Sequence, residues 1–236
     1  MIRKSILRCA TAVTALLIAS PALADPITLD AADIGTSFTL AYNGFVDGSN
    51  VIDGLGGSTT FKLTDVTSTG YTFDYSVANT TDSGLTSRIS SFAFDTNPDI
   101  ASASSTGTFD YAVLDSNYPN GIGNVDVCFK GGDSNSCGGN NGGVTTGNTG
   151  TGTLTLNFGA PVSSLTLDNF FIRYQSITGA GNVTSASGAV TSSSGGTQVP
   201  EPGMIVLFGF GLAGVAFASR RRRQVPAAAQ RQPAFA

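Results

Sequence analysis

The chain has 236 residues, a net charge of −4, three cysteines, and neither histidine nor tryptophan. The absence of histidine excludes Ser-His-Asp and Cys-His catalytic sets, HExxH sites and histidine-bound metals. Residues 25–199 are more acidic than the whole chain, because four basic side chains stand against fifteen aspartates, a net charge of −11. A body of this charge repels nucleic acid and anionic lipid, so we expect no nucleic-acid partner.

The first 24 residues have the three parts of a secretory signal peptide. Basic residues come first: Arg3, Lys4 and Arg8. An apolar stretch over residues 9–19 follows, and Ala22 and Ala24 form a small-x-small cleavage site before Asp25. We expect the secretion translocon to recognise residues 1–24 and Asp25 to begin the mature protein. The alternative is an uncleaved N-terminal anchor.

Residues 25–191 predict an acidic, all-β domain, an antiparallel β-sandwich or jelly roll. Apolar and polar residues alternate with a period of two at residues 38–42, 61–64, 71–77, 92–94 and 154–158. A hairpin is expected to turn near residues 68–70. The apolar residues from Leu165 to Tyr174 change phase at Asp168-Asn169, which predicts a β-bulge there.

Two glycine-rich segments and one pair of cysteines lie within or after the β-rich part of the sequence. Residues 131–152 are glycine-rich and predict a loop, and residues 192–198 predict a flexible Gly/Ser/Thr linker. Cys128 and Cys137 remain as an even pair once the signal peptide is removed, which predicts a disulfide in an oxidising compartment. The alternative, a metal or redox pair, is less consistent with a spacing that is not CxxC.

The C-terminal segment, residues 199–223, has three consecutive parts. A short proline motif comes first: Val199, Pro200, Glu201 and Pro202. The uncharged residues 203–219 then span about 26 Å as a helix, enough for a thin bilayer core. A basic cluster ends the segment and is expected to stay in the cytoplasm: Arg220, Arg221, Arg222 and Arg223. The alternatives are an ordinary C-terminal anchor and a buried core helix. Residues 224–236 predict a disordered tail.

This combination of parts resembles the PEP-CTERM sorting signal of Gram-negative bacteria. The resemblance implies processing by an exosortase-type membrane peptidase, a transient stay in the inner membrane, and delivery to the cell surface, outer membrane or extracellular matrix. It also implies an exopolysaccharide or biofilm context. The thirteen residues after Arg223 depart from the family pattern. Three body segments are similar to a paired-cysteine ("cistern") subfamily: FAFDTNPD at Phe92, VDVCFKGG at Val125 and LTLDNFFIRYQSI at Leu165.

Aspartate-rich turns are the candidates for a metal site, since oxygen ligands suit Ca²⁺. One turn contains Asp47 and Asp53, and the other contains Asp95 and Asp99. Neither has the EF-hand spacing, and turns also use Asp and Asn for their own backbone bonds. The sequence therefore predicts no cofactor, with calcium as an alternative.

The remaining candidates concern sugars. Tyr111, Tyr118 and Phe171 are candidates for exposed aromatics of a carbohydrate-binding module. Asn79 and Asn182 begin matches to the glycosylation sequon. Glycoside hydrolysis requires a pair of carboxylates, but no aspartate stands in a recognisable catalytic context. We expect a non-catalytic surface or matrix protein, with a carbohydrate-binding module as the alternative.

Overall fold

The computed structural model describes residues 26–139, 141–195 and 197–198. The predicted signal peptide, the sorting segment over residues 199–223 and the predicted tail over residues 224–236 lie outside these residues. Strands dominate the described part, accompanied by one short 3-10 helix, η1 (Ala31–Asp33). None of the helical structure within it is long and apolar enough to cross a membrane.

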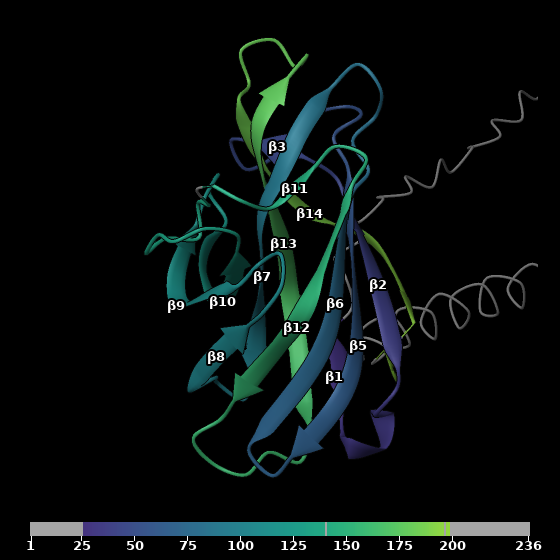
Figure 1. Ribbon diagram of the computed structural model, residues 1–236, viewed down its shortest axis with the longest axis vertical. Coiled ribbons are helices and arrows are strands. Elements are labelled where there is room, and N and C mark those ends of the chain that lie inside the picture. Colours follow the sequence, from purple (N-terminus) through teal and green to yellow (C-terminus); the bar gives the residue numbers. More distant parts are fainter. Residues whose placement is uncertain (1–25, 140, 196, 199–236) are drawn as a thin grey trace, which may run out of the picture.

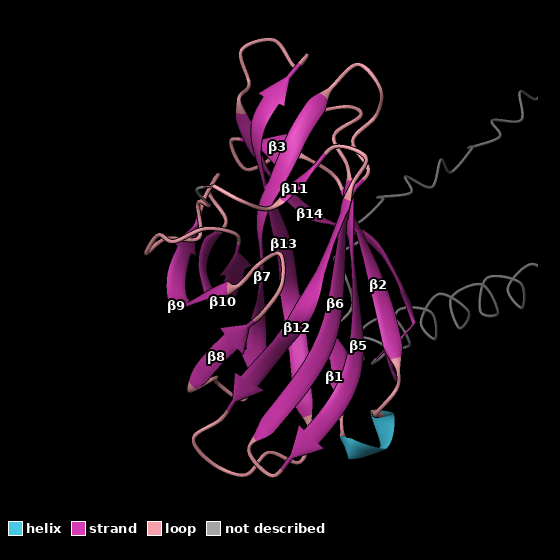
Figure 2. Cartoon of the chain, in the orientation of Figure 1, coloured by secondary structure: helices cyan, strands magenta, loops and turns pink. Residues whose placement is uncertain are grey.

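The strands form one antiparallel network, which confirms the predicted fold class (Figures 1 and 2). Their bounds are β1 (Ile27–Leu29), β2 (Ser37–Tyr42), β3 (Phe45–Val46), β4 (Asn50–Val51), β5 (Gly57–Thr67), β6 (Gly70–Asn79), β7 (Thr86–Asn97), β8 (Ser102–Ser105), β9 (Tyr111–Tyr118), β10 (Gly123–Lys130), β11 (Val144–Thr145), β12 (Thr149–Asn157), β13 (Leu165–Thr178), β14 (Ser185–Gly195) and β15 (Thr197–Gln198). The main path runs β8-β12-β6-β5-β2-β14-β13-β7-β10-β9.

Strand β14 joins the two layers of the sandwich. Its first half pairs with β13 and its second half pairs with β2, with a register shift after Val190. The inner faces meet in an aromatic core, in which Phe61 of one layer lies 6.0 Å from Phe94 of the other between ring centroids. The end strands β8 and β9 also contact each other, so the network forms a nearly closed barrel.

Two local predictions are confirmed. Strands β5 and β6 form a hairpin whose turn lies at residues 68–69. Strand β13 has a register shift between Asp168 and Phe171, and Asn169 has a φ of 49°. Because of this bulge, the apolar side chains on both sides of it reach the same core.

Two predictions about irregular chain are wrong. Residues 192–195 pair with β2, and β15 pairs with β1, so the predicted linker belongs to the sheet. The side chains over residues 191–194 are Thr and Ser and are mostly exposed, so no apolar alternation reveals the strand. Residues 149–152, predicted as loop, begin β12. Gly152 is needed there because a Cβ would collide with the Thr106 carbonyl and the Tyr75 ring.

Candidate functional site

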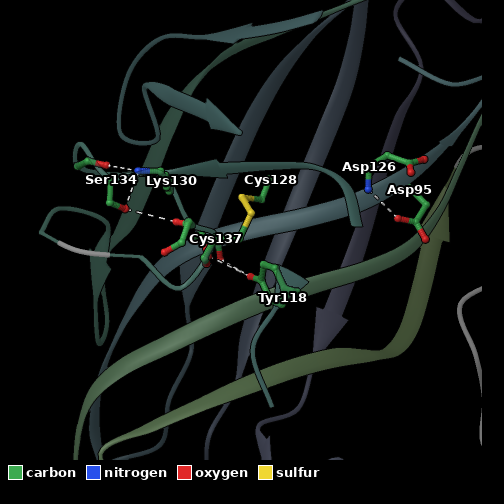
Figure 3. Close-up of a disulfide and its surroundings, with 10 residues drawn as sticks. Asp95, Tyr118, Asp126, Cys128, Lys130, Ser134 and Cys137 are labelled. Atoms are coloured by element: carbon green, nitrogen blue, oxygen red, sulfur yellow. Dashed lines mark hydrogen bonds between the residues drawn. A yellow bond between two sulfur atoms is a disulfide. The ribbon is translucent and has the colours of Figure 1, made fainter. Parts of the chain in front are cut away.

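A second, smaller cluster of buried side chains lies on the outer face of β7 and β10. It contains Ala93, Tyr118, Val125 and the two cysteines. Cys128 and Cys137 form a disulfide, with Cα atoms 6.0 Å apart, which confirms the predicted pair (Figure 3). The disulfide fixes the loop after β10 to the outer face of the sheet.

Lys130 holds the same loop from inside the disulfide ring. Its Nζ donates to Ser134 Oγ at 2.9 Å (Figure 3). It also donates to the Gly132 carbonyl at 2.7 Å and lies 5.3 Å from the centre of the Tyr111 ring. The residue is fully buried. Burial lowers the pKa of Lys130, and nearby aspartates oppose that shift. Lys130 is therefore part of the loop's internal structure.

The three candidate aromatics do not form an exposed row. Tyr118 is completely buried, and its hydroxyl lies 3.1 Å from Ser91 Oγ. The half-buried Phe171 packs on it, with ring centroids 6.1 Å apart. Only Tyr111 is well exposed. The expectation that all three are exposed is wrong, because the disulfide loop and its small core cover this part of the sheet.

The four candidate calcium ligands differ in their surroundings. Asp47, Asp53 and Asp99 are exposed. Asp95 is half-buried, and its carboxylate accepts from the Asp126 backbone at 3.0 Å and from Asn169 Nδ2 at 2.9 Å. Within residues 26–139, 141–195 and 197–198, no group of three or more Asp, Glu, Cys or His could hold a metal ion. The calcium prediction therefore rests on the sequence alone.

A polar pocket of about 470 Å³ lies where the disulfide loop meets β7, β13 and β14. Polar side chains and one glycine line it: Arg88, Gly139, Asn141, Gln175, Ser176, Thr184 and Ser185. A neighbouring pocket shares Arg88 and Ser176 with it and is otherwise lined by Ser and Thr. No carboxylate appears among these lining residues, although the body is rich in aspartate.

The loop sets the positions of the main polar groups in this pocket. Arg88 Nη1 donates to the Gly142 carbonyl, and Nη2 donates to Gln175 Oε1 at 3.1 Å. Gln175 Nε2 in turn donates to the Gly138 carbonyl at 2.9 Å. The arginine and the glutamine are thus held by each other and by the segment that follows Cys137.

A second arginine lies behind the pocket. Arg173 is only 8% exposed, and its Nη2 donates at 3.0 Å to Ser185 Oγ, which lines the pocket. Its Nη1 donates at 2.8 Å to the side-chain oxygen of Asn120, with the amide oriented so that its oxygen faces this donor. Its Nε has no hydrogen-bond partner in the described part of the chain. Burial lowers the pKa of Arg173, and no carboxylate is among the groups that act on it.

Sequence reasoning did not identify this pocket. The available signal was that Arg88 and Arg173 are two of only four basic residues in the body. Their two strands, β7 and β13, are neighbours, which places both arginines at one end of the same layer.

The described structure ends where the sorting segment begins. Strand β15 ends at Gln198. A family model described as the PEP-CTERM protein-sorting motif matches residues 198–223, which include the proline motif, the apolar run and the four arginines. No curated protein matches the chain. The chain therefore carries a PEP-CTERM protein-sorting motif, the mark of an exported protein that an exosortase processes at the membrane.

Proposed function

We propose that the chain is a non-catalytic component of the cell surface or extracellular matrix, associated with exopolysaccharide. The observation that carries the proposal is the sorting motif at residues 198–223, which follows the all-β domain directly. The signal-peptide pattern at residues 1–24 supports entry through the secretion translocon. The three segments quoted above and the Cys128–Cys137 bond support membership of the paired-cysteine subfamily.

The composition of the body supports a role without catalysis. It has no histidine and no glutamate, which removes the residues that most often act as general acids and bases. Aspartate is the only side-chain carboxylic acid in the body, and the half-buried Asp95 already accepts two hydrogen bonds. These features favour a structural or binding role.

Carbohydrate binding is the second candidate, and the polar pocket at Arg88 is the observation that favours it. Amide, hydroxyl and guanidinium groups that converge in a concave site are typical of ligand pockets. The exposed aspartates at Asp47, Asp53 and Asp99 would supply oxygen ligands if Ca²⁺ assisted such binding.

Cell fractionation tests the proposed location. The mature protein should be found with the surface or matrix fraction, and enzymatic removal of the exopolysaccharide should release it into the medium. A protein that stays in the inner membrane or the periplasm, or whose surface retention does not change when the polysaccharide is removed, would contradict the proposal.

A further inference from the structure

The pocket at Arg88 is a local exception to the charge of the body. The body carries −11, yet the lining of this pocket and of its neighbour contains an arginine and no acid. Arg173 adds a second guanidinium directly behind Ser185, also without a carboxylate among the groups that shift its pKa in the described structure. Buried charges are normally paired, yet the buried Arg173 is bonded to the neutral side chains of Ser185 and Asn120. Arg88 is half-buried and is bonded to the neutral Gly142 carbonyl and Gln175 side chain.

The pocket has hydrogen-bond donors to offer that anion. A guanidinium carries five N–H donors, and Arg88 uses its two terminal nitrogens for one bond each to Gly142 and Gln175. The Ser185 oxygen accepts from Arg173, so its own hydrogen can be donated to a ligand. Arg88 and Ser185 therefore present donors to the same space.

The other lining side chains can form hydrogen bonds with hydroxyl groups of a ligand. Gln175 keeps a second N–H after its bond to Gly138, and Ser176 and Thr184 are exposed hydroxyl residues at the rim. The volume of about 470 Å³ is much larger than a single inorganic anion needs and lies in the range of small-molecule sites. The lining thus combines one cationic point with several neutral polar groups.

We propose that this pocket binds a hexuronate unit of an acidic saccharide. Arg88 binds the carboxylate, because a guanidinium pairs with a carboxylate through two parallel hydrogen bonds. Gln175, Ser176, Thr184 and Ser185 bind the ring hydroxyls. A neutral sugar would leave Arg88 without a counter-charge, and a small inorganic anion would leave the hydroxyl-binding side of the pocket unused.

The charge of the body limits how such a ligand binds. Repulsion from the aspartates is screened over about 8 Å at physiological ionic strength, so a short saccharide or a chain end can enter the pocket. A long anionic chain lying along the surface would come within that distance of many aspartates and would be repelled by them. We therefore assign the pocket to one hexuronate unit, with the adjoining sugars of a short saccharide or a chain end beside it.

The disulfide belongs to this site as well as to the fold. Gly138, Gly139, Asn141 and Gly142 approach the pocket from the segment after Cys137. Without the disulfide this segment loses its covalent attachment and keeps its hydrogen bonds to Ser91, Arg88 and Gln175 and the pairing of β11 with β7. The positions of Arg88 and Gln175 then become less fixed. Binding should therefore depend on the oxidised pair.

Calorimetry on the mature protein tests the site with trigalacturonate and its fully methyl-esterified form, which has the same sugar skeleton without charge. The acid should bind at least about tenfold more tightly than the ester, the factor expected for one charge-assisted pair. Arg88→Gln should weaken binding of the acid by about tenfold or more. Lys62→Gln makes the same charge change at an exposed position on β5 and should leave affinity within about twofold.

A second variant tests the pocket without removing its charge. Thr184→Trp places a large side chain at the exposed rim and should block the acid while the urea unfolding midpoint stays that of the wild type. The proposal is overturned if wild type does not bind trigalacturonate, if the ester binds as well as the acid, or if Arg88→Gln and Lys62→Gln bind alike. It is also overturned if inorganic phosphate binds more tightly than trigalacturonate, which would identify a general anion site.

This inference rests on the proposed function only for the polysaccharide context. Cell fractionation tests that context, and calorimetry with pure saccharides tests the pocket. A surface protein that binds no uronate would contradict the pocket alone. A protein that binds uronate and remains in the inner membrane would contradict the location alone.

Discussion

Single buried polar residues connect strands that lie far apart in the sequence. Asn79 at the end of β6 is buried, and its Nδ2 lies within hydrogen-bond distance of the Ser87 carbonyl, Ser87 Oγ and the Val144 carbonyl at 3.2, 3.0 and 3.0 Å. Its Oδ1 accepts from the Thr81 backbone at 3.2 Å. One amide therefore joins β6, β7 and β11, and its burial leaves this sequon closed to modification in the folded protein.

We expect Asn79→Ala to lower the free energy of unfolding by about 1–3 kcal/mol, because buried backbone groups lose their partner. Urea unfolding of the mature protein measures this change. Asn182→Ala is the matched control, since Asn182 starts the other sequon and is exposed, so its effect should stay within about 0.5 kcal/mol. Equal effects of the two substitutions would contradict this role for Asn79.

The raised pKa of Asp95 predicts that the free energy of unfolding depends on pH in the acidic range. Burial raises the pKa of Asp95 above the ordinary 3.8, and the bonds from the Asn169 side chain and the Asp126 backbone offset this only in part. The negative charges of Asp126 and Asp168 add smaller upward shifts. The folded protein therefore binds this proton more tightly than the unfolded chain. The contribution of Asp95 to stability is lowest above its folded pKa and increases as the pH falls from there towards 3.8.

Comparison with Asp95→Asn isolates this contribution. The free energy of unfolding of the wild type, relative to that of Asp95→Asn, should increase between neutral pH and about pH 4.5. Urea titrations at the two pH values measure it, and Asp53→Asn, at an exposed turn, is the control. A wild type that loses stability relative to Asp95→Asn on acidification would refute the assignment.

At the scale of elements, the disulfide loop acts as a separate small unit on the outer face of the sheet. Cys128 belongs to β10, Cys137 lies in the loop after it, and both are buried with Tyr118. Lys130 closes the loop internally through Gly132 and Ser134. The stability of this unit therefore depends more on covalent and polar links than on apolar area.

Replacing both cysteines by alanine should lower the free energy of unfolding by about 2.5–3 kcal/mol, the entropy expected for closing a ring of this size. Urea unfolding of the double variant Cys128→Ala/Cys137→Ala measures the loss, and trigalacturonate binding should disappear with it. Lys62→Gln, which lies outside the loop, should show neither effect. A double variant with wild-type stability and binding would show that the loop is held by other contacts.

Elements whose apolar side chains are buried could be predicted from the sequence, whereas elements formed by backbone pairing or covered by a distant loop could not. The β5–β6 hairpin and the Asp168-Asn169 bulge were predictable because apolar side chains alternate and change phase there. The end of β14 was not, because its backbone pairs with β2 while its Ser and Thr side chains face solvent. Tyr118 was placed on the wrong side because the alternation of β9 does not show that a distant disulfide loop covers its end.

The candidate pocket was unpredictable for a related reason. Arg88, Gln175 and Ser185 belong to three strands, and only the pairing of β7, β13 and β14 brings them together. The sorting motif could be predicted, since its proline motif, apolar run and arginines are contiguous in the sequence.

At the scale of the whole molecule, folding brings the two ends of the domain together. Thr28 pairs with Thr197 in β15, and Ile27 pairs with Gln198, the first residue of the sorting match. The strand that follows the predicted signal-peptide cleavage site is thus bonded to the strand that precedes the sorting motif. The strand pair β1 and β15 therefore brings the two ends of the described domain together.

Replacing Pro200, Glu201 and Pro202 by alanine should leave a full-length form in the inner membrane. The apolar run over residues 203–219 can still span the bilayer, whereas recognition by the exosortase is lost. Immunoblots of membrane and surface fractions measure the outcome, and alanine at Gln224, Val225 and Pro226, beyond the arginines, is the matched control. A motif variant that is processed and released like wild type would show that the segment serves only as an anchor.

Mass spectrometry of the two termini of the mature protein, isolated from fractionated cells, tests the central claim most directly. The account predicts that the mature chain begins at Asp25, lacks everything from the arginine cluster onward, and is found outside the inner membrane. A chain that retains Arg220–Arg223 and remains in the inner membrane would contradict it.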